Sequence, residues 1–165
     1  MDQSQANRVV CELFETRYAA LVRYVYRSLG RLSAAEDVVQ EAFMDLYKQL
    51  AGGAQIEYPS AWVFSVARRR VSRENRRYRE TTALHEQLEA LDHAAQGQVQ
   101  PAPFALEGSD LIRVSALSRR EEEVLLLRME ALKYMEIGEV LGISSGSVGA
   151  LIARALEKLR GVAHV

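Results

Sequence analysis

The sequence predicts an all-α protein made of two small helical domains joined by a flexible linker. Apolar residues recur at spacings of three and four over most of its 165 residues, and no segment alternates as a strand would. Residues 97–103 contain Gln, Gly and Pro and show no periodicity, which is typical of a linker. We therefore expect a first domain over residues 1–80, a linker over 81–104 and a second domain, with a helix-turn-helix, over 105–165.

Composition and charge exclude several classes of protein. Hydrophobic residues make up 48% of the chain and charged residues 26%, which suits a globular protein with a core. The single cysteine, Cys11, excludes an internal disulfide framework and fits a reducing compartment. No apolar run approaches membrane-spanning length, and the polar N-terminus carries no signal-peptide pattern. We therefore expect a cytoplasmic protein without membrane insertion.

Three amphipathic helices are expected in the first domain. The first carries an apolar stripe that begins at Phe14, and Gly30 ends it. Residues 33–36 read as a capping box that opens the second helix. Pro59 is well placed in a first helical turn and opens the third.

The second domain carries the most informative pattern. Residues 118–121 form another capping box, and residues 136–141 predict a short helix that Gly142 ends in the left-handed conformation. Ser144 then caps the next helix. This order predicts a helix-turn-helix, whose second helix is sized for a DNA major groove, with an ordinary helical hairpin as the alternative. The residues expected to face inward on this last helix are Val148, Ile152, Ala155, Leu156 and Leu159.

No catalytic or metal-binding pattern is found in the sequence. The three histidines are scattered, and none pairs with Cys11 or with an acid at a metal-ligand spacing. There is no Gly-rich phosphate loop with its lysine. Residues 142–146 match the nucleophile-elbow string, but a helix rather than a strand precedes them, so Ser144 is interpreted as a helix cap. We expect no enzymatic activity, no metal and no cofactor.

Two charged surfaces are the candidate functional sites. On the second helix Asp37, Gln40 and Glu41 lie opposite the apolar stripe, where a simple solvated face is the alternative. Residues 68–79 contain seven arginines against one acid, and these arginines cannot all share one helical stripe. Some of them therefore face solvent, yet the cluster is dense enough to bind phosphates. Four nearby aromatic residues are candidates to stack on unpaired bases, with Trp62 favoured as a core residue instead: Tyr58, Trp62, Phe64 and Tyr78.

The order of these features resembles one family, the bacterial RNA polymerase sigma factors of the extracytoplasmic-function (ECF) type in the sigma-70 family. Residues 35–43 are similar to the family's polymerase-binding segment. Residues 59–77 are similar to the segment that melts the promoter, and residues 117–160 to the domain that reads the upstream promoter box. The resemblance covers nearly the whole chain apart from the linker.

The resemblance implies a sigma factor that binds core RNA polymerase and directs promoter-specific transcription initiation. It implies contacts with the clamp helices of the largest polymerase subunit, with the flap of the second-largest subunit, with promoter DNA and with an anti-sigma factor. The residues implied in polymerase docking are Asp37, Gln40 and Glu41. Those implied in melting and holding the downstream element are Gly52, Tyr58, Trp62, Arg68, Arg69, Arg73, Arg76 and Arg77. Those implied at the upstream element are Ser144, Ser145, Ser147, Arg154 and Lys158.

Both DNA-binding helices depart from the family pattern. Arg69 and Arg73 stand where the family usually has Asn and an acid, which makes the melting helix more basic. Residues 149–153 of the recognition helix are Gly-Ala-Leu-Ile-Ala, where the family usually carries polar side chains that can read base edges. Two other functions therefore stay open. One is a free-standing dimeric regulator of duplex operators, and the other is an interaction protein that uses an exposed Leu151.

Overall fold

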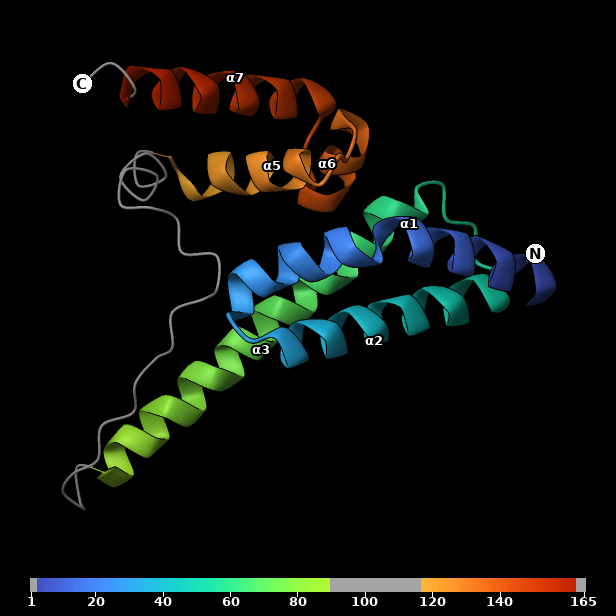
Figure 1. Ribbon diagram of the computed structural model, residues 1–165, viewed down its shortest axis with the longest axis horizontal. Helices are drawn as coiled ribbons and strands as arrows, with labels where there is room; N and C mark the ends of the chain where they lie inside the picture. Colours follow the sequence, from blue (N-terminus) through green and yellow to red (C-terminus); the bar gives the residue numbers. More distant parts are fainter. Residues whose placement is uncertain (1–2, 90–116, 163–165) are drawn as a thin grey trace.

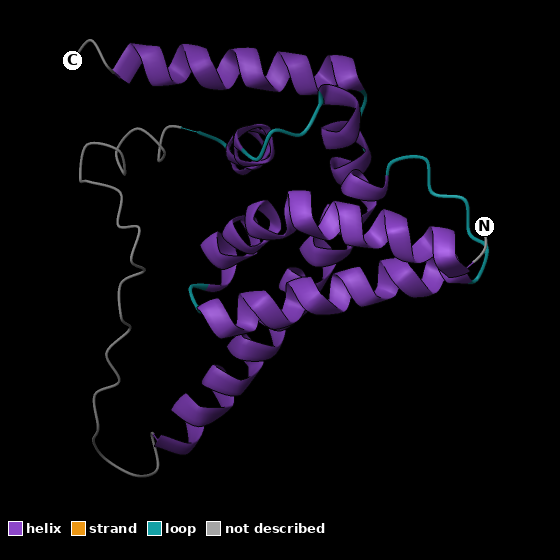
Figure 2. Ribbon diagram, turned by 45° about the vertical axis from the view of Figure 1, so that its right-hand side comes forward, coloured by secondary structure: helices purple, strands orange, loops and turns teal. Residues whose placement is uncertain are grey.

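The computed structural model describes residues 3–89 and 117–162, and all regular structure in these two ranges is helical (Figures 1 and 2). The first domain contains α1 (Gln3–Leu29), α2 (Leu32–Ala51) and α3 (Pro59–Glu89). The second contains α5 (Arg119–Met129), α6 (Tyr134–Leu141) and α7 (Ser145–Val162). The prediction of an all-α protein with two helical domains is confirmed.

The predicted domain limits stay predictions. Residues 97–103, which suggested the linker, lie outside the described residues. Helix α3 itself continues to Glu89, past the expected end of the first domain at residue 80.

The first domain is held together by the apolar faces of its three helices. Helices α1 and α2 lie side by side and α3 crosses them (Figure 1). Side chains from all three are completely buried, among them Leu21, Val39, Leu46 and Phe64. Burial of an aliphatic or aromatic side chain of this size contributes about 1.5–3 kcal/mol. Phe14 differs from the prediction because it is 40% exposed, although its ring packs on Tyr18 and Phe43.

The predicted start of α2 is wrong. The helix begins at Leu32 with Arg31 as its N-cap, and no side chain caps it. Gly30 has φ +67°, so the chain reverses directly after α1 and enters α2 ahead of the expected capping box. The first helical hydrogen bond of α2 already runs from the Ala35 N–H to the Arg31 carbonyl, at 3.1 Å. A turn determined by glycine conformation therefore sets this boundary.

The predicted start of α5 is confirmed. The Ser118 hydroxyl accepts a hydrogen bond from the Glu121 N–H at 3.3 Å, and the Glu121 carboxylate accepts one from the Ser118 N–H at 2.8 Å. These reciprocal bonds satisfy two N–H groups that a helix start otherwise leaves unpaired.

The helix-turn-helix is confirmed as well. Gly142 ends α6 in the left-handed conformation at φ +66°, and the Ser144 hydroxyl accepts from the Ser147 N–H at 3.1 Å. The axes of α6 and α7 are bent by 99°, which lies within the range typical of this motif. Helix α6 begins at Tyr134, two residues before the predicted start at residue 136.

Within the described ranges no single helix is both long and apolar enough to cross a membrane. The bent α6–α7 pair meets the test only by its combined length and composition.

Candidate polymerase and nucleic-acid interface

The acidic face of α2 divides into two parts. Asp37 and Gln40 are exposed. Glu41 is also exposed, but its carboxylate forms an ion pair with the guanidinium of Arg70 on α3, which pairs with Asp45 too. Glu41 therefore helps to hold α3 against α2, while Asp37 and Gln40 are the members of the predicted set that are open to a partner.

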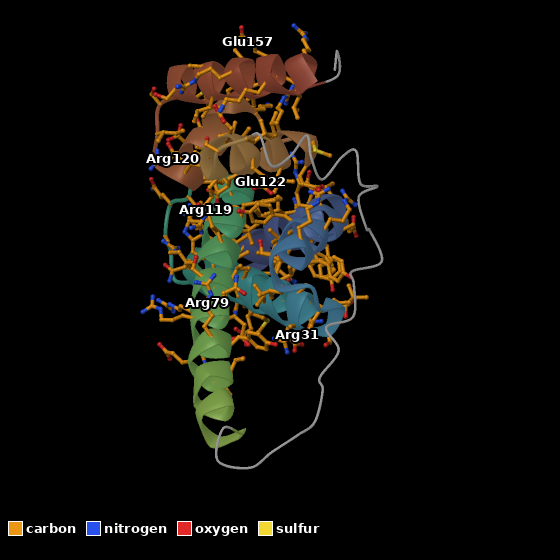
Figure 3. All side chains as sticks on the ribbon, turned by 90° about the vertical axis from the view of Figure 1, so that its left-hand side faces the viewer. Arg31, Arg79, Arg119, Arg120, Glu122 and Glu157 are labelled. Atoms are coloured by element: carbon orange, nitrogen blue, oxygen red, sulfur yellow. The ribbon has the colours of Figure 1, made fainter. Side chains whose placement is uncertain are left out.

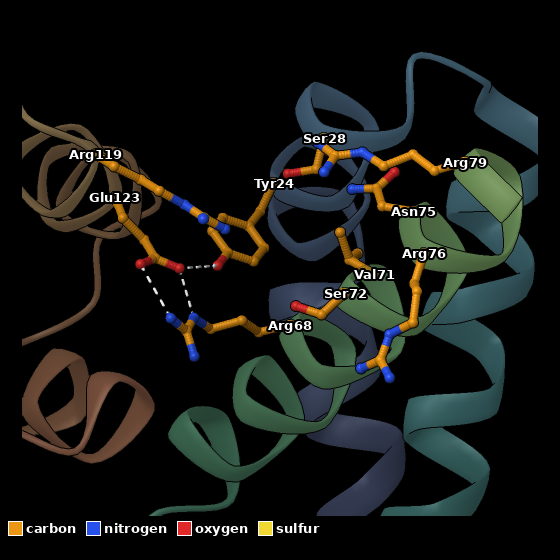
Figure 4. Close-up of a pocket in the computed structure, with 10 residues that line it drawn as sticks. All are labelled: Tyr24, Ser28, Arg68, Val71, Ser72, Asn75, Arg76, Arg79, Arg119 and Glu123. Carbon is orange, nitrogen blue, oxygen red and sulfur yellow. Dashed lines mark hydrogen bonds and ion pairs between the residues drawn. The ribbon is translucent and has the colours of Figure 1, made fainter. Parts of the chain in front are cut away.

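The arginines of α3 fall on two sides of the helix, as their spacing requires. Arg68, Arg76 and Arg79 line a cleft that α1 and α5 complete (Figure 4). Arg73 and Arg77 line a groove on the other side, together with Asp37, Val38 and Glu41 of α2. The prediction that the arginines do not share one stripe is confirmed.

Arg68 has a specific partner in the second domain. Its guanidinium donates two hydrogen bonds to the Glu123 carboxylate of α5, at 2.5 and 3.1 Å, and the Tyr24 hydroxyl lies 3.4 Å from the same carboxylate (Figure 4). The bond to Glu123 raises the pKa of Arg68. Burial, followed by the charge of Glu123, raises the pKa of Tyr24. Glu123 could not be predicted as the partner of Arg68, because the two residues are 55 positions apart and neither segment carries a local signal for the other.

The loop between α2 and α3 begins with a tight turn. The Gly52 N–H donates to the Lys48 carbonyl at 2.9 Å, and Gly53 has φ +88°. Tyr58, at the other end of the loop, is half-buried. Gly52 and Tyr58, at the two ends of this loop, are among the residues that the resemblance implies in holding the downstream element.

The aromatic candidates have different surroundings. Trp62 is half-buried and packs against both apolar clusters of the first domain, which agrees with its interpretation as a core residue. Phe64 is completely buried, so the suggestion that it stacks on bases is wrong. Its ring packs on Tyr24 at a centroid distance of 5.6 Å. Tyr78 is 58% exposed, and the guanidinium of Arg31 lies over its ring at 5.8 Å from the centroid.

The upstream-box residues also separate into structural and exposed members. Ser144 is a helix cap, and the Lys158 ammonium is bound by the Glu121 carboxylate at 2.7 Å. Ser145, Ser147 and Arg154 are exposed on α7.

Two apolar residues of α7 differ from their predicted positions. Leu151, expected to be exposed, is half-buried against the core of the second domain. Leu156, expected inside, is 42% exposed. Gly149 faces the ring of Tyr134, to which an added Cβ would lie 3.6 Å away.

No metal centre is found in the part of the chain that the structure describes: no three His, Cys, Asp or Glu side chains there are grouped to hold an ion. The side chains of the three histidines are outside the described set.

Comparisons with known proteins match both domains. The model of Sigma-70 region 2 matches residues 13–81, and that of Sigma-70, region 4, matches residues 113–159. The ECF RNA polymerase sigma factor SigW of Bacillus subtilis is 30% identical over 146 residues, which cover 82% of this chain and 78% of SigW. The chain belongs to the sigma-70 family, among the ECF sigma factors. An ECF sigma factor is not an enzyme, and it directs transcription initiation by RNA polymerase.

Further relatives cover nearly the whole length of this ECF sigma factor. SigL of Mycobacterium tuberculosis is 29% identical over 152 residues, which cover 90% of this chain and 85% of SigL. The sigma factor RpoE of Bartonella quintana, solved in complex with the anti-sigma factor NepR, superposes with a TM-score of 0.56 at 22% identity. That superposition covers 93% of this chain and 95% of RpoE and shows a shared fold. Family membership excludes the alternative of a free-standing helix-turn-helix regulator.

Proposed function

We propose that this sigma factor docks on the clamp helices of the largest polymerase subunit through the face of α2 that carries Asp37, Gln40 and Glu41, with Asp37 and Gln40 as the groups open to the partner and Glu41 paired with Arg70 beside them. The observation that carries the proposal is the groove between α2 and α3. Asp37 and Glu41 line one wall of this groove, and Arg73 and Arg77 line the other. A polymerase helix seated on the acidic wall would therefore lie beside arginines that bind promoter DNA. This arrangement suits a factor that must couple the two partners.

Promoter opening is assigned to the first domain. Arg69, Arg73, Arg76 and Arg77 are exposed on α3, where they can reach backbone phosphates, and only a long ion pair of 3.9 Å to Glu74 competes for Arg77. The loop from Gly52 to Tyr58, with Trp62 beside it, would receive a base of the displaced strand. Unpairing a base costs a few kcal/mol, which stacking and ion pairing with the captured strand offset.

The second domain is assigned to the upstream promoter box and to the polymerase flap. Ser145, Ser147 and Arg154 would face the DNA from α7, with Ser144 and Lys158 holding the helix in place. We further propose an anti-sigma factor as a regulatory partner and the cytoplasm as the site of action.

Docking is tested by charge reversal at the exposed acid. Asp37→Lys, combined with Gln40→Ala, should abolish co-purification with core polymerase, because the complementary charge is inverted and an amide contact is lost. Glu15→Lys makes the same charge change at an exposed position of α1 and serves as the matched control. Transcription from genomic DNA with wild-type holoenzyme, with mapped RNA start sites, checks initiation itself. Undiminished co-purification of the α2 variant would refute the docking assignment.

A further inference from the structure

A buried glutamate joins the second domain to the first. The Glu130 side chain is 2% exposed, at the C-terminal end of α5. Its carboxylate accepts hydrogen bonds from Arg23 at 2.7 Å and from Arg27 at 3.0 Å, and Arg17 donates to its backbone carbonyl at 3.1 Å. All three arginines belong to α1. Positive charge at a helix C-terminus also complements the helix dipole, so α5 is bound to α1 by both its side chain and its backbone.

A second glutamate on the same face of α5 makes the contact with α3. Glu123 precedes Glu130 by seven residues, which places both on one side of the helix. It binds the Arg68 guanidinium through both carboxylate oxygens. Two carboxylates of the second domain therefore occupy three arginine side chains of the first: Arg23, Arg27 and Arg68.

The same packing places the second domain beside the loop that precedes α3. Helix α6 packs on α3. Its Glu136 shares a pocket with Tyr58, Pro59 and Ser60 at the end of that loop. On the other side, Arg119 and Glu123 of α5 close a cleft of about 350 Å³ over Arg76 and Arg79. The surface that would hold a melted strand is therefore partly covered.

We propose that Glu123 and Glu130 form an intramolecular latch, in which Glu123 occupies the position of a DNA phosphate on Arg68 and so closes the free protein to promoter DNA. A guanidinium that binds one carboxylate through two parallel bonds cannot present the same edge to a phosphate. Strand binding and domain closure therefore compete for Arg68. The inference rests on the proposed function of the first domain in promoter opening, and on the role in holding the promoter strand that the family resemblance implies for Arg68.

The latch is tested in the full chain without polymerase. Glu123→Gln/Glu130→Gln keeps the side-chain shape and removes both charges. Its affinity for a single-stranded non-template promoter oligonucleotide, measured by fluorescence anisotropy, should rise by about 5–150-fold, the range typical of coupling between two sites. Glu122→Gln is the matched control, because Glu122 directly precedes Glu123 in the sequence of α5 and takes part in no ion pair among the described residues. Its side chain is labelled in Figure 3. The affinity of this control variant should equal that of the wild type.

Domain opening is measured separately by the distance between two spin labels. Met44→Cys on α2 and Glu157→Cys on α7 are both exposed sites, and Cys11→Ser removes the native thiol. The latch variant should give a longer and broader distance distribution. Arg23→Gln/Arg27→Gln removes the two α1 partners of the Glu130 carboxylate and should separate the domains in the same way. This variant keeps the test decisive if Glu130→Gln does not fold. Unchanged distances, or opening without tighter strand binding, would overturn the proposal. Failure of the wild-type holoenzyme to melt a promoter would instead refute the proposed function.

Discussion

Lys158 donates a hydrogen bond to the Glu121 carboxylate at 2.7 Å and thereby joins α7 to the start of α5. The same carboxylate closes the capping box with Ser118. Glu121 is thus a single group that orders the beginning of one helix and the position of another. Lys158, which sequence reasoning assigned to DNA, has a structural partner.

This arrangement predicts a dependence of stability on acid pH. The bond from Lys158, followed by the backbone bond from Ser118, lowers the pKa of Glu121 from 4.5 to about 2. A carboxyl with a depressed folded-state pKa contributes full stability above its unfolded pKa and loses that contribution as the pH falls through the folded pKa. The difference in Tm between wild type and Glu121→Gln should therefore be full above about pH 5 and shrink towards pH 2. Thermal unfolding followed by circular dichroism measures it, and a difference that stays constant with pH would contradict the assignment.

Two glycines of the helix-turn-helix should respond in opposite directions to the same substitution. A Cβ added at Gly138 would lie 2.6 Å from the Ile143 carbonyl oxygen, a backbone atom that cannot move aside cheaply. Gly138→Ala should therefore destabilise the protein by about 1–3 kcal/mol, as overpacking does. Gly149→Ala meets only the Tyr134 ring at an ordinary 3.6 Å, so it should stabilise the helix by up to about 1 kcal/mol. Urea unfolding of both variants measures the change in the free energy of unfolding. If both substitutions change it in the same direction, the turn is less tightly packed than the structure indicates.

The exposed arginines of α3 should determine how strongly promoter opening depends on salt. Neutralising Arg73, Arg76 and Arg77 together should reduce open-complex formation. The logarithm of the binding constant falls linearly with the logarithm of the salt concentration, and we call the steepness of this fall the salt slope. The triple substitution should lower the salt slope by about 0.7 for each lost contact with single-stranded DNA. Arg70→Ala is the control on the same helix, because Arg70 is held by Glu41 and Asp45 and should affect stability rather than the slope. Permanganate footprints that are unchanged in the triple variant would show that the cluster only keeps the surface soluble.

Helix ends and turns could be predicted from the sequence where they depend on residues close together in the chain. The Ser118 capping box and the Gly142 turn were predicted correctly, because each depends on residues within one helical turn. The start of α2 was misplaced, because the reversal at Gly30 came before the expected box and determined the boundary. The prediction that Phe64 stacks on unpaired bases is wrong, because only the packing of α1 against α3 reveals that its ring is buried.

In the candidate site, too, local features could be predicted from the sequence and contacts between distant segments could not. Exposed charges on one helix, such as Asp37, could be predicted from periodicity alone. Partners across domains could not, because Arg68 and Glu123 are separated by 55 residues and nothing in either segment specifies the other. The sequence therefore predicted which groups could bind DNA, while the structure showed which of them are already occupied.

The last prediction concerns how the upstream promoter box is read. The exposed face of α7 offers Ser145, Ser147 and Arg154 as hydrogen-bonding groups, with Ala150 and Ala153 between them. Alanine can touch a thymine methyl but cannot donate to a base edge. Binding should therefore be weak and dominated by backbone contacts, and single base-pair changes should each cost less than about 1 kcal/mol, below the range for good direct readout.

Arg154→Ala distinguishes backbone contact from base reading. If Arg154 binds a phosphate, its loss should weaken binding about equally for all upstream sequences and reduce the salt slope by about 0.9. Lys158→Ala should instead lower the Tm and leave that slope nearly unchanged, because the ammonium is held by Glu121. Scanning substitutions across the upstream box, with the holoenzyme and each variant, measure both effects. Losses of about 1–3 kcal/mol confined to single base pairs, and removed by Arg154→Ala, would show that this helix reads bases directly.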